Sequence, residues 1–373
     1  MYKDKNKKVP LLILAFIVGG FVGYAMHTNQ IVSQNLEGSA NRSLVSSQAR
    51  DLQNVSQAEM ADVEDLDDGT GNKVPTPNKI LLFGGLNNPQ YLNDLWQSPG
   101  GKTWNLVPTG GTMMSLGTVG NTMLYYKNKL YLLGGITGLN QNVWMFDGAS
   151  WIQKTTFPGK GSDSGYGSAV YKGKIYVFGG ADSNDVPTNE FWSYDGNIWT
   201  QLTNAPFAPR RYFLTIVYQN QFWVIGGVDS NSNYLKDVWS YDGNTWSSHG
   251  NVPWTNISNG SEQTASIFDD GTGPKIYVMG GVDSYGTPNS NVWAFDGNAW
   301  TQKPNGGWSK RGGLRSFTLY GKLFVVGGYS SFTNTYFDDV WSTGDGSTWQ
   351  LEKPHSAWGP RSTFSVAKVP STF

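Results

Sequence analysis

The sequence predicts an all-β fold in which six similar units of four strands form a closed β-propeller. A stretch of the form KIYVFGG (residues 174–180) has five further variants: KILLFGG, KLYLLGG, QFWVIGG, KIYVMGG and KLFVVGG. Their glycine pairs recur at intervals of about 50 residues, a period typical of propeller blades. The first glycines of the pairs are Gly84, Gly134, Gly179, Gly226, Gly280 and Gly327. The 47 glycines and 14% aromatic residues are typical of aromatic-rich strands joined by tight turns.

Residues 1–26 are predicted to be a membrane anchor or a signal peptide. Lysines within the first eight residues precede an uncharged stretch at 9–26, whose length is at the short end for a membrane-spanning helix. Basic residues on this side favour a cytoplasmic N-terminus and export of the remainder. Cleavage after the small residues Gly23 and Ala25 is the alternative. The propeller is therefore expected outside the cytoplasm, either tethered to the membrane or, after cleavage, secreted.

Residues 27–78 are predicted to form a flexible stalk. This segment contains no Phe, Tyr or Trp, is rich in Ser, Gln and Asn, and becomes acidic between residues 59 and 68. A chain of this composition buries too little apolar area to offset the entropy lost on ordering.

Residues 79–373 hold the repeated units, each with strands a, b, c and d. In GSAVYKGKIYVFGG (167–180), strands a and b flank a Lys-Gly turn, and in WSYDGNTW (239–246), strands c and d flank an Asp-Gly turn. Asp-Gly between apolar runs is a strong hairpin signal. Strand b is apolar throughout, which is expected of a strand covered on both faces. The glycine pair is expected to let a neighbouring aromatic ring lie over the backbone where strand b ends.

The C-terminal segment is predicted to close the ring. The first unit begins directly at KILLFGG and lacks strand a, whereas RSTFSVAKV (361–369) has no strand b after it and is similar to LRSFTLY (314–320). The C-terminal strand is therefore expected to complete the first unit. Closure of this kind removes the open sheet edges at which proteins aggregate.

The repeated pattern resembles the kelch motif, in which a glycine pair ends one strand and a Tyr-type residue and a Trp follow at set distances. The resemblance covers residues 79–373 and implies a β-propeller of four-stranded blades. The central domain of galactose oxidase carries similar blades. The copper site of that enzyme requires a cysteine linked to a tyrosine, and the absence of cysteine here excludes it.

The composition also narrows the class of function. A net charge of −1 gives no basic field for nucleic acid. Without cysteine there is no thiolate metal site, and the three histidines are widely spaced, so we predict no metal and no cofactor. Asp229, Asn231 and Asn233 alternate as in a calcium loop, but no Gly and Glu complete the pattern, and turn formation is the alternative.

The connections between strands b and c and between d and a are expected to share one face, where propellers of this kind usually meet ligands. Their aromatic residues lie among Asn, Asp and Ser, a combination suited to stacking on sugar rings and to hydrogen bonding of hydroxyl groups. The alternative is that the tryptophans pack the blades and the polar residues form turns. The aromatic residues predicted to bind a ligand are Tyr91, Tyr234, Trp254, Tyr285, Trp308, Tyr336 and Trp358.

Charged residues at the starts of the a strands are expected to surround the mouth of the central channel. Arginines there could hold an anionic group through paired hydrogen bonds, so Arg211 and Arg361 join the predicted binding residues. Packing between blades is the alternative. The full set comprises Arg210, Arg211, Glu262, Arg311, Arg315 and Arg361.

This arrangement is similar to that of two families of six-bladed enzymes, the sialidases and the kelch-type sialic-acid mutarotases. That resemblance implies a possible catalytic set of Glu262, Arg211 and Arg315. The Tyr-Glu pair and the Arg-Ile-Pro signature of sialidases are not identifiable, and STGDGSTW (342–349) only approaches their Asp-box. We therefore predict a non-enzymatic module that binds a glycan or a protein and contacts the membrane through residues 9–26, with a sugar-active enzyme as the alternative.

Overall fold

The computed structural model describes residues 78–110, 120–135, 141–159, 165–182, 184, 186–254, 262–283 and 285–373, and the backbone of two short strands, β1 (Leu66–Asp67) and β2 (Lys73–Val74). The predicted anchor at 1–26 and most of the predicted stalk at 27–78 lie outside these residues. In the part of the chain that the structure describes, no helix is long and apolar enough to cross a membrane.

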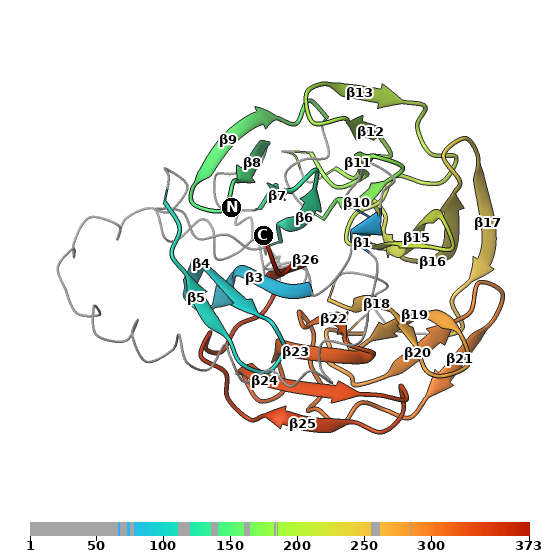
Figure 1. The fold of residues 1–373 in the computed structure, drawn as a ribbon. Coiled ribbons are helices and arrows are strands. Elements are labelled where there is room, and N and C mark those ends of the chain that lie inside the picture. The colour runs from blue at the N-terminus through green and yellow to red at the C-terminus, as the bar shows by residue number, and fades with distance from the viewer. Residues whose placement is uncertain are drawn as a thin grey trace, which may run out of the picture. The chain divides into compact units, whose positions relative to one another are not determined.

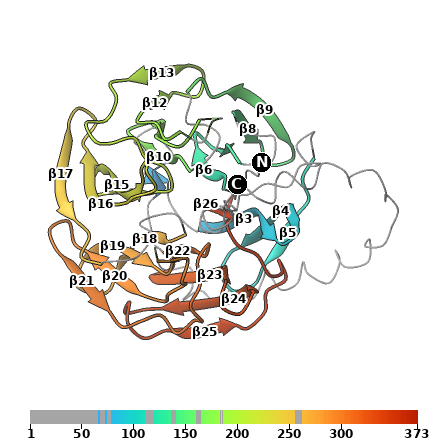
Figure 2. The same cartoon turned by 180° about the vertical axis from the view of Figure 1, so that it is seen from behind.

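Six antiparallel sheets of four strands form the predicted ring, which Figures 1 and 2 show from its two sides. We number these sheets as blades in chain order and give the innermost strand first. Blade 1 holds β26 (Ser365–Pro370), β3 (Asn78–Asn87), β4 (Gln90–Ser98) and β5 (Asn105–Val107). Blade 2 holds β6 (Thr122–Tyr126), β7 (Lys129–Leu133), β8 (Asn142–Phe146) and β9 (Trp151–Thr156). Blade 3 holds β10 (Gly167–Tyr171), β11 (Lys174–Phe178), β12 (Phe191–Tyr194) and β13 (Trp199–Leu202).

The remaining three blades follow the same order of strands. Blade 4 holds β14 (Leu214–Tyr218), β15 (Gln221–Val228), β16 (Tyr234–Tyr241) and β17 (Trp246–Asn251). Blade 5 holds β18 (Thr264–Asp269), β19 (Pro274–Met279), β20 (Val292–Phe295) and β21 (Trp300–Lys303). Blade 6 holds β22 (Arg315–Leu319), β23 (Lys322–Ser330), β24 (Thr335–Thr343) and β25 (Gln350–Lys353).

The C-terminal strand completes blade 1, which confirms the predicted closure. Strand β26 pairs antiparallel with β3, from Ser365 opposite Phe83 to Pro370 opposite Asn78. Beyond the strand, the Lys79 ammonium donates a hydrogen bond to the Phe373 carbonyl oxygen at 3.0 Å. The first and last parts of the ring are thus joined by backbone pairing, as the two ends of the sequence pattern required.

Apolar side chains between neighbouring sheets hold the blades together. The described residues contain six hydrophobic clusters, and each joins two adjacent blades, including blade 6 to blade 1. In β11, Ile175 and Val177 belong to the cluster with blade 2, whereas Tyr176 and Phe178 belong to the cluster with blade 4. Successive side chains of a strand point to opposite faces, so strand b must be apolar at every position.

The glycine pair ends strand b where the next blade begins. Gly179 has a φ of +61°, and a Cβ there would lie 2.8 Å from the Arg210 carbonyl oxygen and 2.9 Å from the Phe213 ring. A side chain would therefore be strained by the backbone and blocked by its neighbours. This confirms that the pair makes room for a neighbouring aromatic ring.

The Asp-Gly sequences form the predicted hairpin turns between strands c and d. In blade 4, the Asp242 carboxylate accepts hydrogen bonds from the backbone N–H groups of Asn244 and Thr245 at 2.7 and 2.8 Å. These bonds hold the pKa of Asp242 below its ordinary value. Asp147, Asp195, Asp296 and Asp345 make the same pair of contacts in their own blades.

Candidate ligand-binding face

The b–c and d–a connections lie at the same end of the blades, as predicted. Isolated backbone bridges join a residue three positions before an innermost strand to the end of strand b, for example Arg211 to Val228 in blade 4 and Gly312 to Tyr329 in blade 6. We call this end of the ring the loop face. It carries the b–c hairpins, which connect β3 to β4 and β23 to β24 in the two blades that meet where the ring closes.

Three large apolar side chains are exposed on the loop face of adjacent blades 5, 6 and 1. Tyr285, Phe332 and Tyr91 are 79%, 72% and 38% exposed, and each belongs to a b–c connection. The hairpins of blades 5 and 6 are joined by a hydrogen bond from the Ser331 hydroxyl to the Gly286 carbonyl oxygen at 3.1 Å. Large apolar side chains exposed together on a folded surface are typical of interaction sites.

An open cleft of about 380 Å³ lies on the same side, where blade 6 meets blade 1. We call it the 6–1 cleft. Amide, hydroxyl and phenol groups dominate its lining, and none of the lining residues is Lys, Arg, Asp or Glu. The lining residues are Asn87, Asn88, Asn334, Thr335, Tyr336 and Pro360.

Two tyrosines of blade 6 fix the shape of the 6–1 cleft. The Tyr329 hydroxyl donates to the Asn334 side-chain oxygen at 3.0 Å, and the rings of Tyr329 and Tyr336 lie 4.5 Å apart. Burial raises the pKa of Tyr336 to about 12, and the neighbouring Tyr329, Glu262 and Tyr91 add to this rise. A backbone hydrogen bond from Asn88 opposes it. Tyr336 therefore bridges from the hairpin of blade 6 to that of blade 1.

The tryptophans of the d–a connections are packed between blades and offer no ring face to a ligand. Trp254, Trp308 and Trp358 are 4%, 3% and 2% exposed. Each meets a tryptophan of the following blade edge to face, as Trp308 meets Trp349 with ring centroids 4.5 Å apart and planes at 88°. The packing alternative therefore describes these three residues, and we leave them out of the candidate ligand site.

Arg361 was expected to bind an anion. It instead forms a buried salt bridge, and the same kind of salt bridge recurs in blades 4 and 6. Its guanidinium donates to both carboxylate oxygens of Asp94, at 2.6 and 2.9 Å, and to the Gly84 carbonyl oxygen at 2.9 Å. Trp96 donates to the same carboxylate at 2.6 Å. The equivalent groups are Arg210, Asp237 and Trp239 in blade 4 and Arg311, Asp339 and Trp341 in blade 6. These three guanidinium groups are directed into the blades and are not available at the channel mouth.

Glu262 and Arg315, by contrast, do lie within electrostatic reach of each other. They precede or begin the innermost strands of blades 5 and 6, and the Gly313 N–H donates to the Glu262 carbonyl oxygen at 2.9 Å. Burial raises the pKa of the Glu262 carboxyl to about 7, although the charge of Arg315 opposes that rise. Burial also lowers the pKa of Arg315 to about 10, against the effect of Glu262. An acid with a pKa near neutrality can exchange protons at physiological pH.

Two other predicted binding residues, Tyr234 of a b–c loop and Arg211 of the channel mouth, differ in how far they join this pair. Burial raises the pKa of Tyr234, and the charges of Glu262 and Asp283 add to that rise, so Tyr234 lies near the carboxylate. Arg211 is buried, its guanidinium carbon lying 5.1 Å from the centre of the Tyr212 ring. The structure thus associates Glu262 with Arg315, Tyr234 and Tyr336.

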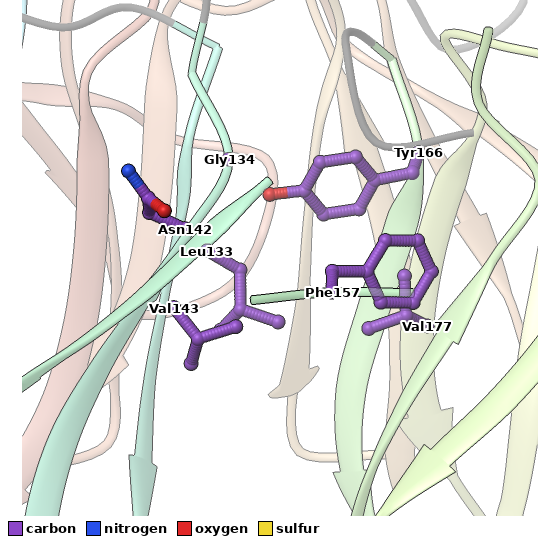
Figure 3. A pocket seen from close by; sticks show the side chains of 7 residues that line it. All are labelled: Leu133, Gly134, Asn142, Val143, Phe157, Tyr166 and Val177. Atoms are coloured by element: carbon purple, nitrogen blue, oxygen red, sulfur yellow. The ribbon is translucent and has the colours of Figure 1, made fainter. Parts of the chain in front are cut away.

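A second cavity, shown in Figure 3, lies between the sheets of blades 2 and 3. It encloses about 10 Å³ between blades 2 and 3, and Tyr166, Phe157 and Leu133 are among the side chains around it. That volume is at the limit of what a single water molecule requires, about 10–15 Å³. A cavity of this size is too small for a sugar residue.

Of the residues that line the 6–1 cleft, sequence reasoning predicted only Tyr336 as a binding residue. Asn87 and Asn88 lie near the start of the ring, whereas Asn334, Thr335 and Pro360 lie near its end, so no local motif connects them. The available signal was the predicted closure itself, which brings the first and last b–c hairpins together.

The fold defines a class of protein, the closed six-bladed β-propeller built of four-stranded repeats. The family model described as the KLHDC2/KLHL20/DRC7 Kelch-repeats domain matches residues 72–270 and 165–370. The chain belongs to the kelch-repeat family.

Other comparisons add the fold alone. A solved structure described as "Structure of YjhT" is similar to this chain with a TM-score of 0.55 and 18% identity, and the match covers 66% of this chain and 86% of that one. No match was found among curated proteins.

Proposed function

We propose that this protein is an exported, membrane-tethered kelch propeller that binds a glycan or a protein through its loop face. The observation that carries the proposal is the exposure of Tyr285, Phe332 and Tyr91 on the loop face of three consecutive blades. Elsewhere in the described ring, aromatic rings are mainly used to pack one blade against the next. Exposed aromatic side chains beside polar groups are the residues that most often anchor ligands.

The binding proposal is tested with the full chain on a glycan array and a panel of surface proteins. A variant carrying Tyr91→Ser, Tyr285→Ser and Phe332→Ser should lose the binding seen with the unmodified chain. The matched control carries Leu106→Ser, Ile152→Ser and Ile198→Ser, which remove exposed apolar side chains from the outer strands or their turns. Equal binding by the unmodified chain and the loop-face variant would contradict the proposal.

Export and tethering rest on residues 1–26, with their lysines followed by an uncharged apolar stretch. The chain contains no cysteine, so Asn197→Cys introduces a single thiol in an exposed turn of blade 3. In spheroplasts, a membrane-impermeant thiol reagent should label this variant. The labelled protein should then be recovered in the membrane fraction. Labelling only after lysis would overturn export, and labelled protein in the medium would favour cleavage of residues 1–26.

A second candidate function is a sugar-active enzyme of the sialic-acid mutarotase or sialidase type. It is favoured by Glu262, whose pKa near 7 and proximity to Arg315 provide an acid–base group beside a cation. Turnover of sialic-acid substrates by the unmodified chain, abolished in Glu262→Gln, would support it. Absence of turnover over a broad panel of sialic-acid substrates would remove it.

A further inference from the structure

The 6–1 cleft has the dimensions of a small-molecule site and carries no formal charge on its lining. Its volume of about 380 Å³ falls at the lower end of the range of ligand pockets, about 300–1,000 Å³. Asn87, Asn88 and Asn334 each bring an amide that can both donate and accept hydrogen bonds. Hydroxyl groups of a sugar have the same dual capacity, so an amide-rich cleft can satisfy several of them together.

Groups of the 6–1 cleft are held in place before any ligand arrives. The Tyr329 hydroxyl donates to the Asn334 side-chain oxygen at 3.0 Å, which orients the amide, and the NH₂ group of that amide is a donor for a ligand. The ring of Tyr336 is fixed against Tyr329, with centroids 4.5 Å apart. Groups fixed in this way lose little conformational entropy on binding.

Aromatic surface lies beside these amides. In the blade 1 hairpin, the partly exposed Tyr91 stands opposite Leu86, and it lies close enough to Tyr336 to contribute to the raised pKa of that residue. Phe332 lies at the tip of the facing hairpin of blade 6. A flat, amphipathic aromatic face can cover the C–H face of a sugar ring while amides bind the hydroxyl groups.

The electrostatics favour an uncharged ligand. None of the lining residues of the cleft is Lys or Arg, so a carboxylate or phosphate would find no cation to pair with there. The Glu262 carboxylate raises the pKa of Tyr336 and makes the surroundings more negative. An anionic sugar would therefore be disfavoured relative to its neutral counterpart.

We propose that the 6–1 cleft binds a neutral sugar residue of a glycan, through the Asn87, Asn88 and Asn334 amides and the Tyr91 and Tyr336 rings. This inference rests on the proposed binding function and names the ligand class for it. Sialylated glycans and protein ligands are the competing occupants.

The test uses the full chain on an array that carries each oligosaccharide in a neutral and a sialylated form. The unmodified chain should bind neutral forms and bind their sialylated counterparts more weakly. Asn334→Asp keeps the side-chain shape but replaces the NH₂ donor with a charged oxygen. It should weaken binding about tenfold or more, as expected when one well-placed hydrogen bond is lost. Asn231→Asp, the same change at an exposed site in the b–c loop of blade 4, should leave binding unchanged.

Each outcome separates the cleft from the wider binding function. If Asn334→Asp binds as the unmodified chain does while the triple loop-face variant does not, the cleft assignment is wrong and the loop-face proposal stands. Stronger binding to sialylated forms, or binding to a surface protein alone, likewise overturns the neutral-sugar inference only. If the unmodified chain binds nothing on either panel, both proposals fail. Equal melting temperatures of the two Asn→Asp variants would show that any loss of binding by Asn334→Asp is not caused by misfolding.

Discussion

Arg361 and Asp94 lie 267 residues apart in the sequence, yet two hydrogen bonds of 2.6 and 2.9 Å join the guanidinium to the carboxylate. The bond links the segment that leads into the last strand to strand β4 of the first blade. It also explains why an arginine at the rim is unavailable to a ligand, since its donors are directed to Asp94, Gly84 and Trp358. The same residue therefore contributes to closure of the ring.

Replacing Arg361 is predicted to destabilise the fold strongly. Arg361→Met leaves the Asp94 carboxylate partly buried without its cation, which should lower the free energy of unfolding by about 3 kcal/mol. Urea denaturation followed by tryptophan fluorescence measures the change. Lys322→Met, which removes a partly exposed cation 3.6 Å from Glu352, is the control and should cost less than about 0.5 kcal/mol.

The double variant Arg361→Met, Asp94→Leu sharpens this prediction. Apolar replacement of both partners removes the buried unpaired charge and should recover much of the lost stability. A single Arg361→Met variant as stable as the Lys322→Met control would show that the salt bridge does not support closure.

Trp308 is predicted to matter for stability and not for ligand binding. Trp308→Ala opens a cavity beside Trp349 and should lower the free energy of unfolding by about 3–5 kcal/mol. Tyr285→Ala, at an exposed site of the neighbouring loop, should change it by no more than about 0.5 kcal/mol. Thermal melting compares the two, with Trp308→Phe as a milder variant. If Trp308→Phe lost ligand binding without losing stability, the prediction would be wrong and Trp308 would belong to the ligand site.

Glu262 is predicted to make stability depend on pH between its unfolded and folded pKa values. The folded pKa of about 7 lies above the ordinary value of about 4.3, so the folded state binds more protons in this window. Stability should therefore fall as pH rises through it and then level off above the folded pKa. Arg315 is the cation that opposes this effect.

The measurement compares the unmodified chain with Glu262→Gln in urea at pH 5 and pH 8. Because the other titrating groups are shared, their contributions cancel in the difference between the two chains. The unmodified chain should lose stability relative to the variant at pH 8. The same difference at both pH values would contradict the raised pKa.

The repeating elements of this fold could be predicted because each blade repeats the same physical constraints. The glycine pair marks a close backbone approach, as at Gly179, and Asp-Gly marks the c–d hairpin, as at Asp242. The closing strand could be predicted because the first unit lacked its innermost strand and the C-terminus carried a spare one.

Side-chain burial at the rim could not be predicted in the same way. Trp308 and Tyr285 are both aromatic residues in polar connections, but only the packed structure shows that one faces Trp349 and the other faces solvent. For Arg361, two spacings were visible in the sequence, an aromatic residue three positions before the arginine and an aspartate two positions before the c-strand Trp. Their connection required the closed ring, as did the 6–1 cleft.

Hydrogen exchange of the backbone amides in residues 78–87 tests the central claim of a ring closed between blades 6 and 1. In the full chain these amides of β3 should exchange slowly, because β26 and β4 pair with them on both sides. In a chain that ends at residue 364 they should exchange much faster, while residues 221–228 of β15 in blade 4 stay protected. Equal protection of residues 78–87 in both chains would contradict closure by the C-terminal strand.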